Sequence, residues 1–440
     1  MNTPGRTFPT WILRGGWLLL ALPGLLSAQT GAGEEISEFK VNGLKVLVKR
    51  RPSSQTVSAG LYFIGGSRNQ TEQNAGLEQL LLNVAVAGSE KYPAEQLRRE
   101  LARTAALLGA ATNRDYSAVS LACTREQFGH GFDLLADAVL HPALAEAEFE
   151  RQRAQMLAAV RNDADPDTQL QRIIGATIFS GHPYEVPEEG TPESLASLKV
   201  GDLQACHARL LQTSRMLLVV VGNVNPAEVR RLAAAAFGHV PVSEPWAAPV
   251  PLLSFAGPSF QRTVRSLPTN YVEGVFGGPA AAADDLPALQ IAVELLKSRL
   301  FAEIRVRHNL SYAPSAELLV RGASTGDISF TTTKISEVMP LVRQELKTLR
   351  ETPQTADDLR SVQALQRTSL YTNTQTNAAQ ARRLAQFEIT GGGWARSLDP
   401  GYEKVTPAQV QRAAQTWLKN FQFFVLGPDT SVTEKTFELP

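Results

Sequence analysis

Three residues at helical spacing, Gln79, Leu82 and Asn83, occupy positions where other side chains would make a hydrolytic metal site. They lie in a predicted amphipathic helix that opens at Gly76 and is closed by Gly88. Gln79 and Asn83 are four residues apart and share one face, and Leu82 lies on the same side. Two histidines and a glutamate at this spacing would bind zinc and activate water. An amide offers zinc no basic nitrogen and leucine accepts no proton, so this helix is expected neither to bind the metal nor to hydrolyse a peptide.

Arg305 and Tyr312 form a second candidate pair. A predicted helix runs from Leu286 to Arg307 and a predicted strand begins over Leu310 to Ala313, so the two side chains lie on either side of one corner. A guanidinium group and a phenol can both donate hydrogen bonds to a peptide carbonyl, or to the oxyanion it becomes. From spacing alone, a surface arginine and a half-buried strand tyrosine are the more common arrangement.

The histidines provide no metal pair, because no two of them are three or four residues apart: His130, His141, His182, His207, His239 and His308. Each is expected to be a surface or hydrogen-bonded core histidine. The charge composition gives no reason to expect a protein that binds nucleic acid or an anionic membrane. Lys plus Arg and Asp plus Glu both number 43, so there is no net charge to attract either partner. The chain has 440 residues, which favours two or three domains.

The N-terminus predicts a secretory signal peptide over residues 1–28. It combines Arg6 and Arg14, an apolar run over 17–22 and the small pair Ser27-Ala28. A membrane anchor is the alternative, but the run is well short of the roughly 20 residues that a spanning helix needs. The mature protein is therefore expected to be exported and soluble, with the bacterial periplasm as its compartment. Its two cysteines, Cys123 and Cys206, could form one disulfide or remain buried thiols.

The order of predicted elements indicates an α+β fold built from a duplicated domain. The dipeptide Asn42-Gly43 predicts a hairpin, Pro93 to Leu108 a helix, and Met216 to Val221 a fully buried strand. Double glycines at Gly65-Gly66 and Gly277-Gly278 each precede a charged helix by roughly eighty residues, so the first half's order recurs in the second. Between the halves lies a proline-rich linker, and the predicted organisation is a domain over 29–239, the linker over 240–255 and a second domain over 256–440.

Several further patterns, in this order and spacing, resemble the pitrilysin or insulinase-like metallopeptidases, including mitochondrial processing peptidase and its two-domain bacterial relatives. The resemblance covers nearly all of the mature chain. The matching residues are Gly65-Gly66-Ser67-Arg68, Asn74-Ala75-Gly76-Leu77, Gly88-Ser89-Glu90-Lys91-Tyr92-Pro93, Gly109-Ala110-Ala111-Thr112-Asn113, His182-Pro183-Tyr184, Gly190-Thr191-Pro192, the run from Ser298 to Arg305, and Leu310-Ser311-Tyr312.

The resemblance implies two homologous domains, each a mainly antiparallel sheet packed with helices, arranged as half of a clamshell. It places the family's two histidine ligands on Gln79 and Asn83, its glutamate base on Leu82 and its distal glutamate ligand on Ala159. All four functional positions are lost together. The residues by which such enzymes hold the substrate backbone fall on Arg305 and Tyr312, and both are present. One further departure is Leu295-Leu296-Lys297, where active relatives often have a glycine-rich loop.

The resemblance therefore implies a subunit without catalytic residues, and without a metal of its own, in a heteromeric zinc peptidase. A zinc-bearing paralogue would be its partner in a heterodimer or higher assembly, and a peptide or unfolded polypeptide its substrate. A stand-alone peptide-binding or scaffold protein with a degenerate peptidase fold is the alternative, which the retained Arg305 and Tyr312 disfavour.

Overall fold

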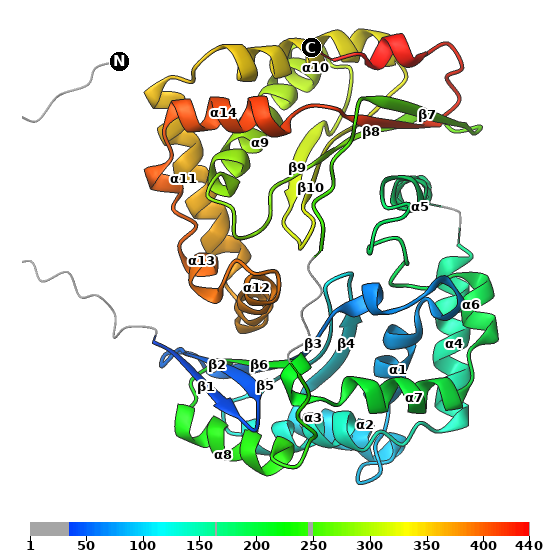
Figure 1. The fold of residues 1–440 in the computed structure, drawn as a ribbon, viewed down its shortest axis with the longest axis vertical. Helices are drawn as coiled ribbons and strands as arrows, with labels where there is room; N and C mark the ends of the chain where they lie inside the picture. The colour runs from blue at the N-terminus through cyan, green and yellow to red at the C-terminus, as the bar shows by residue number, and fades with distance from the viewer. Residues whose placement is uncertain (1–34, 163–164, 245–249, 440) are drawn as a thin grey trace, which may run out of the picture. The chain divides into compact units, whose positions relative to one another are not determined.

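The computed structural model describes residues 35–162, 165–244 and 250–439 (Figure 1). The predicted signal peptide over 1–28 and the middle of the predicted linker lie outside these ranges. Within them, no helix is both long enough and apolar enough to cross a membrane.

The first half contains a six-stranded sheet with the order β1-β2-β6-β3-β5-β4. Strands β2 and β6 are parallel, and every other neighbouring pair is antiparallel. The strands are β1 Ile36–Val41, β2 Leu44–Arg50, β3 Thr56–Ile64, β4 Leu107–Thr112, β5 Tyr116–Thr124 and β6 Met216–Gly222. The helices are α1 Leu77–Ala85, α2 Ala94–Thr104, α3 Phe128–Leu140, α4 Glu146–Val160, α5 Pro166–Ile178, α6 Pro192–Ser197, α7 Val200–Leu210 and α8 Pro226–Phe237.

The second half contains a five-stranded sheet with the order β7-β11-β8-β10-β9. Strands β7 and β11 are parallel, and the other neighbouring pairs are antiparallel. The strands are β7 Ser259–Val264, β8 Asn270–Gly277, β9 Ser315–Leu319, β10 Thr325–Thr332 and β11 Gln422–Gly427. The helices are α9 Leu286–Leu300, α10 Ile335–Glu351, α11 Ala356–Asn373, α12 Asn377–Ile389, α13 Trp394–Leu398 and α14 Pro407–Trp417.

The two sheets share one topology once β1 is set aside. In each, a first strand is parallel to the last strand of its half, and three further strands follow in the same order and directions. The prediction of a duplicated α+β domain is therefore confirmed. In the first sheet, Asn42 and Gly43 both have positive φ, which is the backbone of the two-residue hairpin that Asn-Gly predicts.

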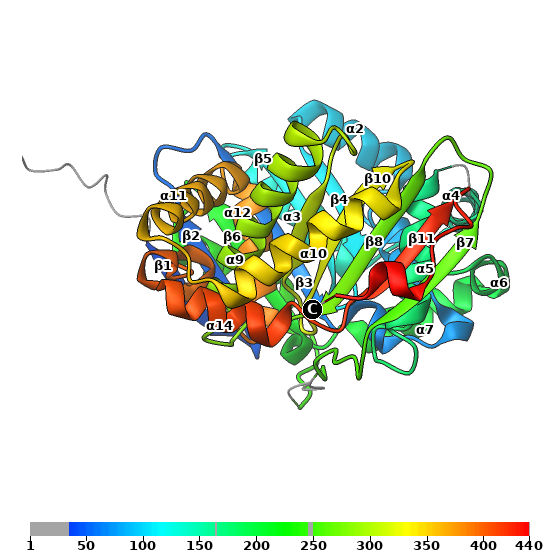
Figure 2. The ribbon, with the colours of Figure 1, turned by 90° about the horizontal axis from the view of Figure 1, so that it is seen from above.

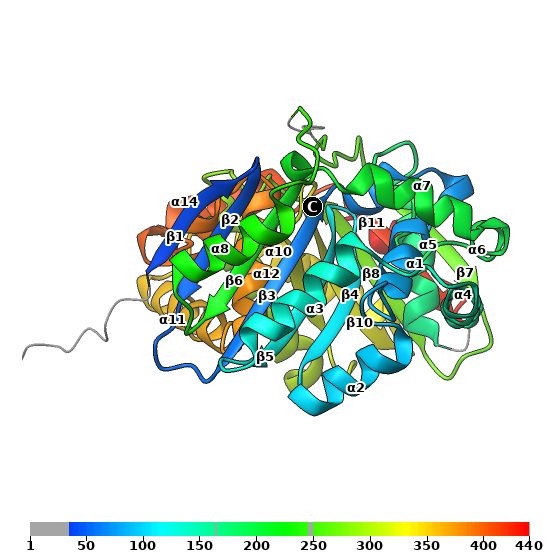
Figure 3. The same ribbon diagram turned by 90° about the horizontal axis from the view of Figure 1, so that it is seen from below.

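Each sheet is covered on one face by helices of its own half. Figure 2 shows α9, α10 and α14 over the second sheet, and Figure 3 shows α3 and α8 over the first. The other face of the first sheet packs against Leu384 and Ala385 of α12, a helix from the second half. Strand β6 is consequently buried on both faces, with Leu218 and Val220 on one side and Val219 on the other, as its continuous apolar run predicts.

The exchange of helices is reciprocal, because α5 of the first half packs on the second sheet. Leu170 and Ile174 of α5 contact Phe424 and Leu426 of β11 in a buried cluster. The amide of Gln171 donates a hydrogen bond of 2.6 Å to the carboxyl of Glu273 on β8. The halves are therefore joined by buried apolar contacts as well as by the linker.

The turns of the two equivalent hairpins also meet. The buried carboxylate of Asp115, between β4 and β5, accepts the backbone N–H of Gly322 at 3.1 Å. The buried Tyr184 hydroxyl donates to Asp115 and accepts the N–H of Ala323, also at 3.1 Å. These bonds fix the turn between β9 and β10 against the first half.

Two predicted elements were wrong in their extent. The helix predicted over Pro93 to Leu108 ends at Thr104, and Ala105 has the left-handed φ of a helix end. Leu107 to Thr112 then forms β4, because its backbone pairs with β5. The strand predicted over Leu310 to Ala313 begins only at Ser315, since Pro314 has no N–H to give to a ladder.

The two cysteines lie apart in the core, Cys123 on β5 and Cys206 on α7, and both are free thiols. Burial raises the pKa of each thiol to about 11. Of the two alternatives that the sequence left open, the structure therefore shows buried thiols.

Candidate functional site

Helix α1 begins at a close backbone contact that only glycines permit. Gly76 has φ +83°, and a Cβ there would come within 2.9 Å of the Cα of Gly190. Gly190 also has a left-handed φ. The hydroxyl of Ser194 in α6 donates to the carbonyl of Ala75 at 2.8 Å. The loop around Gly190 and helix α6 thereby hold the start of α1 in place. This contact explains why the patterns Asn74-Ala75-Gly76-Leu77 and Gly190-Thr191-Pro192 occur together.

On α1, the two amides at the metal-ligand positions bond to each other. The Gln79 amide nitrogen donates a hydrogen bond of 2.7 Å to the Asn83 side-chain oxygen. The two residues are four apart, so they are neighbours on the helix surface. The Asn83 amide nitrogen contacts the sulfur of Met156 on α4 at 3.7 Å. Leu82 is buried in the core of the first half. The position of a catalytic base is therefore filled by a core leucine.

Ala159, the fourth position, lies at the end of α4 with an exposed methyl side chain. Its carbonyl accepts a hydrogen bond of 3.1 Å from Arg172 of α5. Zinc needs imidazole, thiolate or carboxylate ligands. Gln79 and Asn83 offer two mutually bonded amides beside a thioether, and the methyl group of Ala159 is no ligand. The residues present do not fit a zinc ion, and no chemical step can pass through one here.

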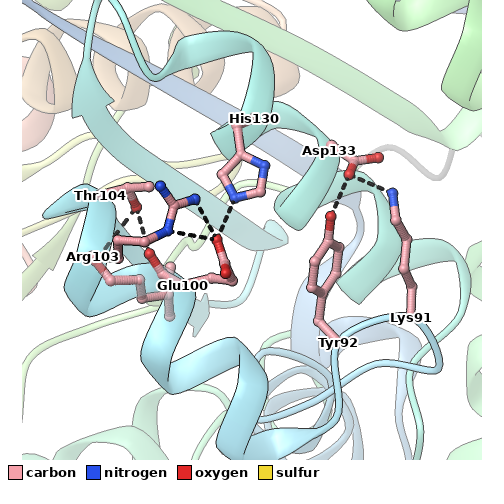
Figure 4. A network of polar contacts seen from close by, with 8 residues as sticks. Lys91, Tyr92, Glu100, Arg103, Thr104, His130 and Asp133 are labelled. Carbon is pink, nitrogen blue, oxygen red and sulfur yellow. Dashed lines mark hydrogen bonds and ion pairs between the residues drawn. The ribbon is translucent and has the colours of Figure 1, made fainter.

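Several of the histidines have hydrogen-bond partners. His130 bonds to Glu100 at 2.9 Å, and His207 bonds to the carbonyl of Val139 at 2.7 Å. Figure 4 shows the first of these beside the contacts that Lys91 and Tyr92 make with Asp133, which fasten the segment before α2 to α3. Within residues 35–162, 165–244 and 250–439, no three histidines, cysteines or carboxylates are grouped as metal ligands would be.

Arg305 and Tyr312 come together as the sequence predicted, although Tyr312 lies in a loop. Arg305 is in a π-helical segment, Phe301–Arg307, that continues α9. Such segments are frequent at functional sites. One Arg305 N–H donates to the carbonyl of Tyr312 at 2.6 Å, and the guanidinium lies 4.0 Å from the centre of the Tyr312 ring. Leu295 and Leu296 are buried in α9, so the departure noted at Leu295-Leu296-Lys297 is part of a helix.

Tyr312 is 76% exposed even though its ring lies against the Arg305 guanidinium. No other part of the described chain accepts a hydrogen bond from the remaining Arg305 N–H groups or binds the Tyr312 hydroxyl. The contact between Arg305 and Tyr312 orients both side chains. Among the described residues, the other Arg305 N–H groups and the Tyr312 hydroxyl remain free to donate hydrogen bonds.

A cavity of about 660 Å³ lies between α5, the loop over 185–192 and strands β8 to β10. Val160, next to Ala159, is one of its lining residues, so the cavity adjoins Ala159. Its charged groups include Arg321, Glu273 and Asp327, none of which the sequence singled out. Their grouping depends on pairing between strands and on the exchanged helix α5, which no local pattern encodes.

Comparison with known proteins gives successive matches along the chain. The family described as insulinase (peptidase family M16) matches residues 45–191, and the peptidase M16 inactive domain matches residues 197–365. A solved structure described as a peptidase M16 inactive domain, from Pseudomonas fluorescens, superposes with a TM-score of 0.81 at 18% identity, covering 91% of this chain and 99% of that one. At this identity the likeness shows the fold.

Two curated relatives match part of the chain. Rat cytochrome b-c1 complex subunit 1 is 30% identical over 283 residues, which are 62% of this chain and 59% of that protein. The beta subunit of mitochondrial-processing peptidase from Blastocladiella emersonii is 26% identical over 285 residues, 61% of this chain and 60% of that protein. The chain thus spans less than two thirds of these relatives. Because two models of one family match in succession and the duplicated fold agrees with them, the chain belongs to peptidase family M16.

Proposed function

We propose that this chain is a non-catalytic subunit of an exported zinc peptidase, binding peptide substrate for a zinc-bearing paralogue. The observation that carries the proposal is the contrast between two sites. The four positions of the metal site are lost, while Arg305 and Tyr312 remain assembled with free donors. A protein that had lost every contact with peptides would have no reason to keep an exposed arginine–tyrosine pair.

A second feature supports binding of an extended peptide. Strand β4 is the outer strand of the first sheet, so one row of its backbone N–H and C=O groups has no neighbouring strand in that sheet. Helix α1, which carries Gln79 and Asn83, packs beside β4. An extended peptide can pair with such an edge through main-chain hydrogen bonds.

The names of the relatives support assembly with other chains. One is named as a subunit of the cytochrome b-c1 complex and another as a subunit of mitochondrial-processing peptidase. In the proposed assembly the partner supplies zinc, the attacking water and the base, and this chain supplies donors to the peptide backbone. A scaffold role without proteolysis is the alternative, and the experiment below separates the two.

The test is turnover of a long unfolded peptide by the zinc-bearing paralogue alone, by this chain alone and by the co-purified pair. We expect turnover by the pair, none by this chain, and a much lower rate for the paralogue alone. Equal rates for the paralogue with and without this chain would contradict the proposal and favour the scaffold role.

The purified chain is expected to hold no stoichiometric zinc, and restoring Q79H, L82E and N83H together should not create an enzyme. Ala159 would still leave the metal without its third protein ligand, since catalytic zinc sites use three. Metal analysis after exposure to zinc and dialysis checks the first statement, and peptide turnover by the triple variant checks the second. The matched variant adds A159E to the three changes and should bind zinc more tightly. About one zinc per wild-type chain would contradict the prediction.

A further inference from the structure

Helix α5 is held on the second sheet by few buried side chains. Of its 13 residues, Leu170 and Ile174 are the two that are buried, and both pack against β8 and β11. Figure 1 shows α5 lying against the second sheet, and its main contacts are with those two strands. An element with so little buried apolar surface separates from its neighbours more readily than the surrounding core does.

Two carboxyl groups lie beneath α5 on neighbouring strands. Glu273 on β8 is 9% exposed, and Asp327 on β10 is half-buried. Both line the cavity of about 660 Å³, and α5 forms one of its walls. The cavity is acidic, because six carboxyl side chains and three arginines line it: Asp167, Glu185, Glu188, Glu189, Glu273, Asp327, Arg114, Arg172 and Arg321.

The arginines of the cavity have partners other than Glu273 and Asp327. Arg114 lies 3.1 Å from the carboxylate of Glu188, and the charges of Glu188 and Asp115 both act on Arg321. Arg172 donates to a backbone carbonyl at the end of α4 at 3.1 Å. The positive charges of the cavity are therefore directed to other groups than the two carboxyls beneath α5.

The groups around these two carboxyls come from every element packed against them: Asp167 and Gln171 on α5, Glu317 on β9, Ser329 on β10 and Lys297 on α9. Strand β11 places Phe424 opposite Glu273 and adds no charge. Lys297 acts on Asp327, but its effect is smaller than that of Glu317. The hydrogen bond that Gln171 donates to Glu273 opposes the repulsion between the acids. Apart from Lys297, the charges that act on the pair are negative.

Protonation of the two carboxyls is coupled to the docking of α5. Burial, followed by the charge of Asp327, raises the pKa of Glu273 from 4.5 to about 7. Burial, followed by the charge of Glu317, raises the pKa of Asp327 from 3.8 to about 6. A group whose pKa is raised in the docked state stabilises that state fully below its ordinary pKa, and this contribution is lost as the pH rises to the raised value. Docking of α5 is therefore strongest in acid and weakens until about pH 7.

We propose that α5 is a pH-controlled wall of the cavity, which lies on the second sheet in acid and separates from it above neutral pH. The switch is the negative charge that Glu273 and Asp327 acquire beneath the helix, close to Asp167 on the helix itself. Separation of α5 opens the cavity while both sheets stay folded. The inference does not depend on the proposed role in peptide binding.

The experiment is amide hydrogen exchange of the full chain at pH 5 and pH 8, measured by mass spectrometry. Each rate is divided by the intrinsic rate at that pH, which removes the base catalysis of exchange itself. Protection of the α5 amides is expected to fall by on the order of 10²-fold from pH 5 to pH 8, because each unit of difference in pKa changes the equilibrium tenfold. The amides of α8 and α10, which lie outside the cavity, should keep their protection.

E273Q should retain most of the protection of α5 at pH 8, because the glutamine cannot acquire the charge. The matched control is E294Q. Glu294 also accepts a side-chain amide bond, from Gln366 at 3.2 Å, but it lies on α9 outside the cavity. E294Q should lose protection of α5 as the wild type does.

Equal protection of α5 at the two pH values would overturn the proposal. A parallel loss in α5, α8 and α10 would also overturn it, since that pattern is destabilisation of the whole chain rather than separation of one helix. A wild-type loss in folded E273Q would do the same. If E273Q does not fold, D167N at an exposed position of α5 removes one of the repelling charges, and a loss of protection as large as that of the wild type would count against the switch.

Discussion

Arg305→Ala is expected to lower turnover by the co-purified pair by about 10²–10³-fold, the usual cost of removing one donor to a developing oxyanion. The chain should still fold and assemble, because among the described residues the Arg305 side chain bonds only to the Tyr312 carbonyl and stacks only on the Tyr312 and Phe301 rings. The matched control is Arg307→Ala, in the same π-helical segment, whose side chain is 68% exposed and pairs with Glu303. It should leave turnover within a few-fold of the wild-type rate.

Tyr312→Phe tests the second donor while keeping the ring under the Arg305 guanidinium. Removing only the hydroxyl is expected to lower turnover, as Arg305→Ala does. The control is Tyr371→Phe, at another exposed tyrosine, on α11, which should leave turnover unchanged. Turnover is measured together with the pair's elution volume, so that loss of assembly is not mistaken for loss of rate. Wild-type turnover in both R305A and Y312F would show that the pair is ordinary surface and would favour the scaffold role.

The shared face of Gln79 and Asn83 could be predicted from the sequence because its geometry is local. Residues four apart on a helix share a face whatever lies around them, and the hydrogen bond between Gln79 and Asn83 has that spacing. The buried strand β6 was predicted for a similar reason, since a continuous apolar run needs cover on both faces. The duplicated order of elements was readable from the recurrence of double glycines before helices.

The features that were missed depend on contacts between distant segments. Met156 contacts Asn83, and only its place one turn before Ala159 on the same helix could have indicated this. Strand β4 has helix-like residues, and pairing with β5 makes it a strand. Glu273 accepts its hydrogen bond from Gln171 of α5, a residue 102 positions away in the sequence. Sequence periodicity reports which face of an element is apolar, but not which element of the other half will cover it.

Glu273 has a consequence for stability because it is buried beneath that exchanged helix. Its side chain is 9% exposed, and burial, reinforced by the charge of Asp327, raises the pKa of Glu273 from its ordinary 4.5 to about 7. Asp167 on α5 and Glu317 on β9 add to the repulsion, while the bond from Gln171 opposes it. Between these two pH values the folded chain holds a proton that the unfolded chain has released. This contribution to stability is therefore complete below pH 4.5 and is lost as the pH rises to about 7.

Glu273→Gln is accordingly expected to remove this part of the pH dependence. At pH 8 the variant should be more stable than the wild type by up to about 3 kcal/mol, and near pH 4 the two should be alike, since one unit of pKa corresponds to about 1.4 kcal/mol. The glutamine oxygen can still accept from Gln171, so α5 keeps its bond. Urea unfolding across this pH range measures the effect, with Glu95→Gln as the control because that side chain is 77% exposed. If E273Q and wild type lose stability in parallel from pH 5 to 8, the buried carboxyl is not protonated in the folded chain, and α5 must tolerate a charge beneath it.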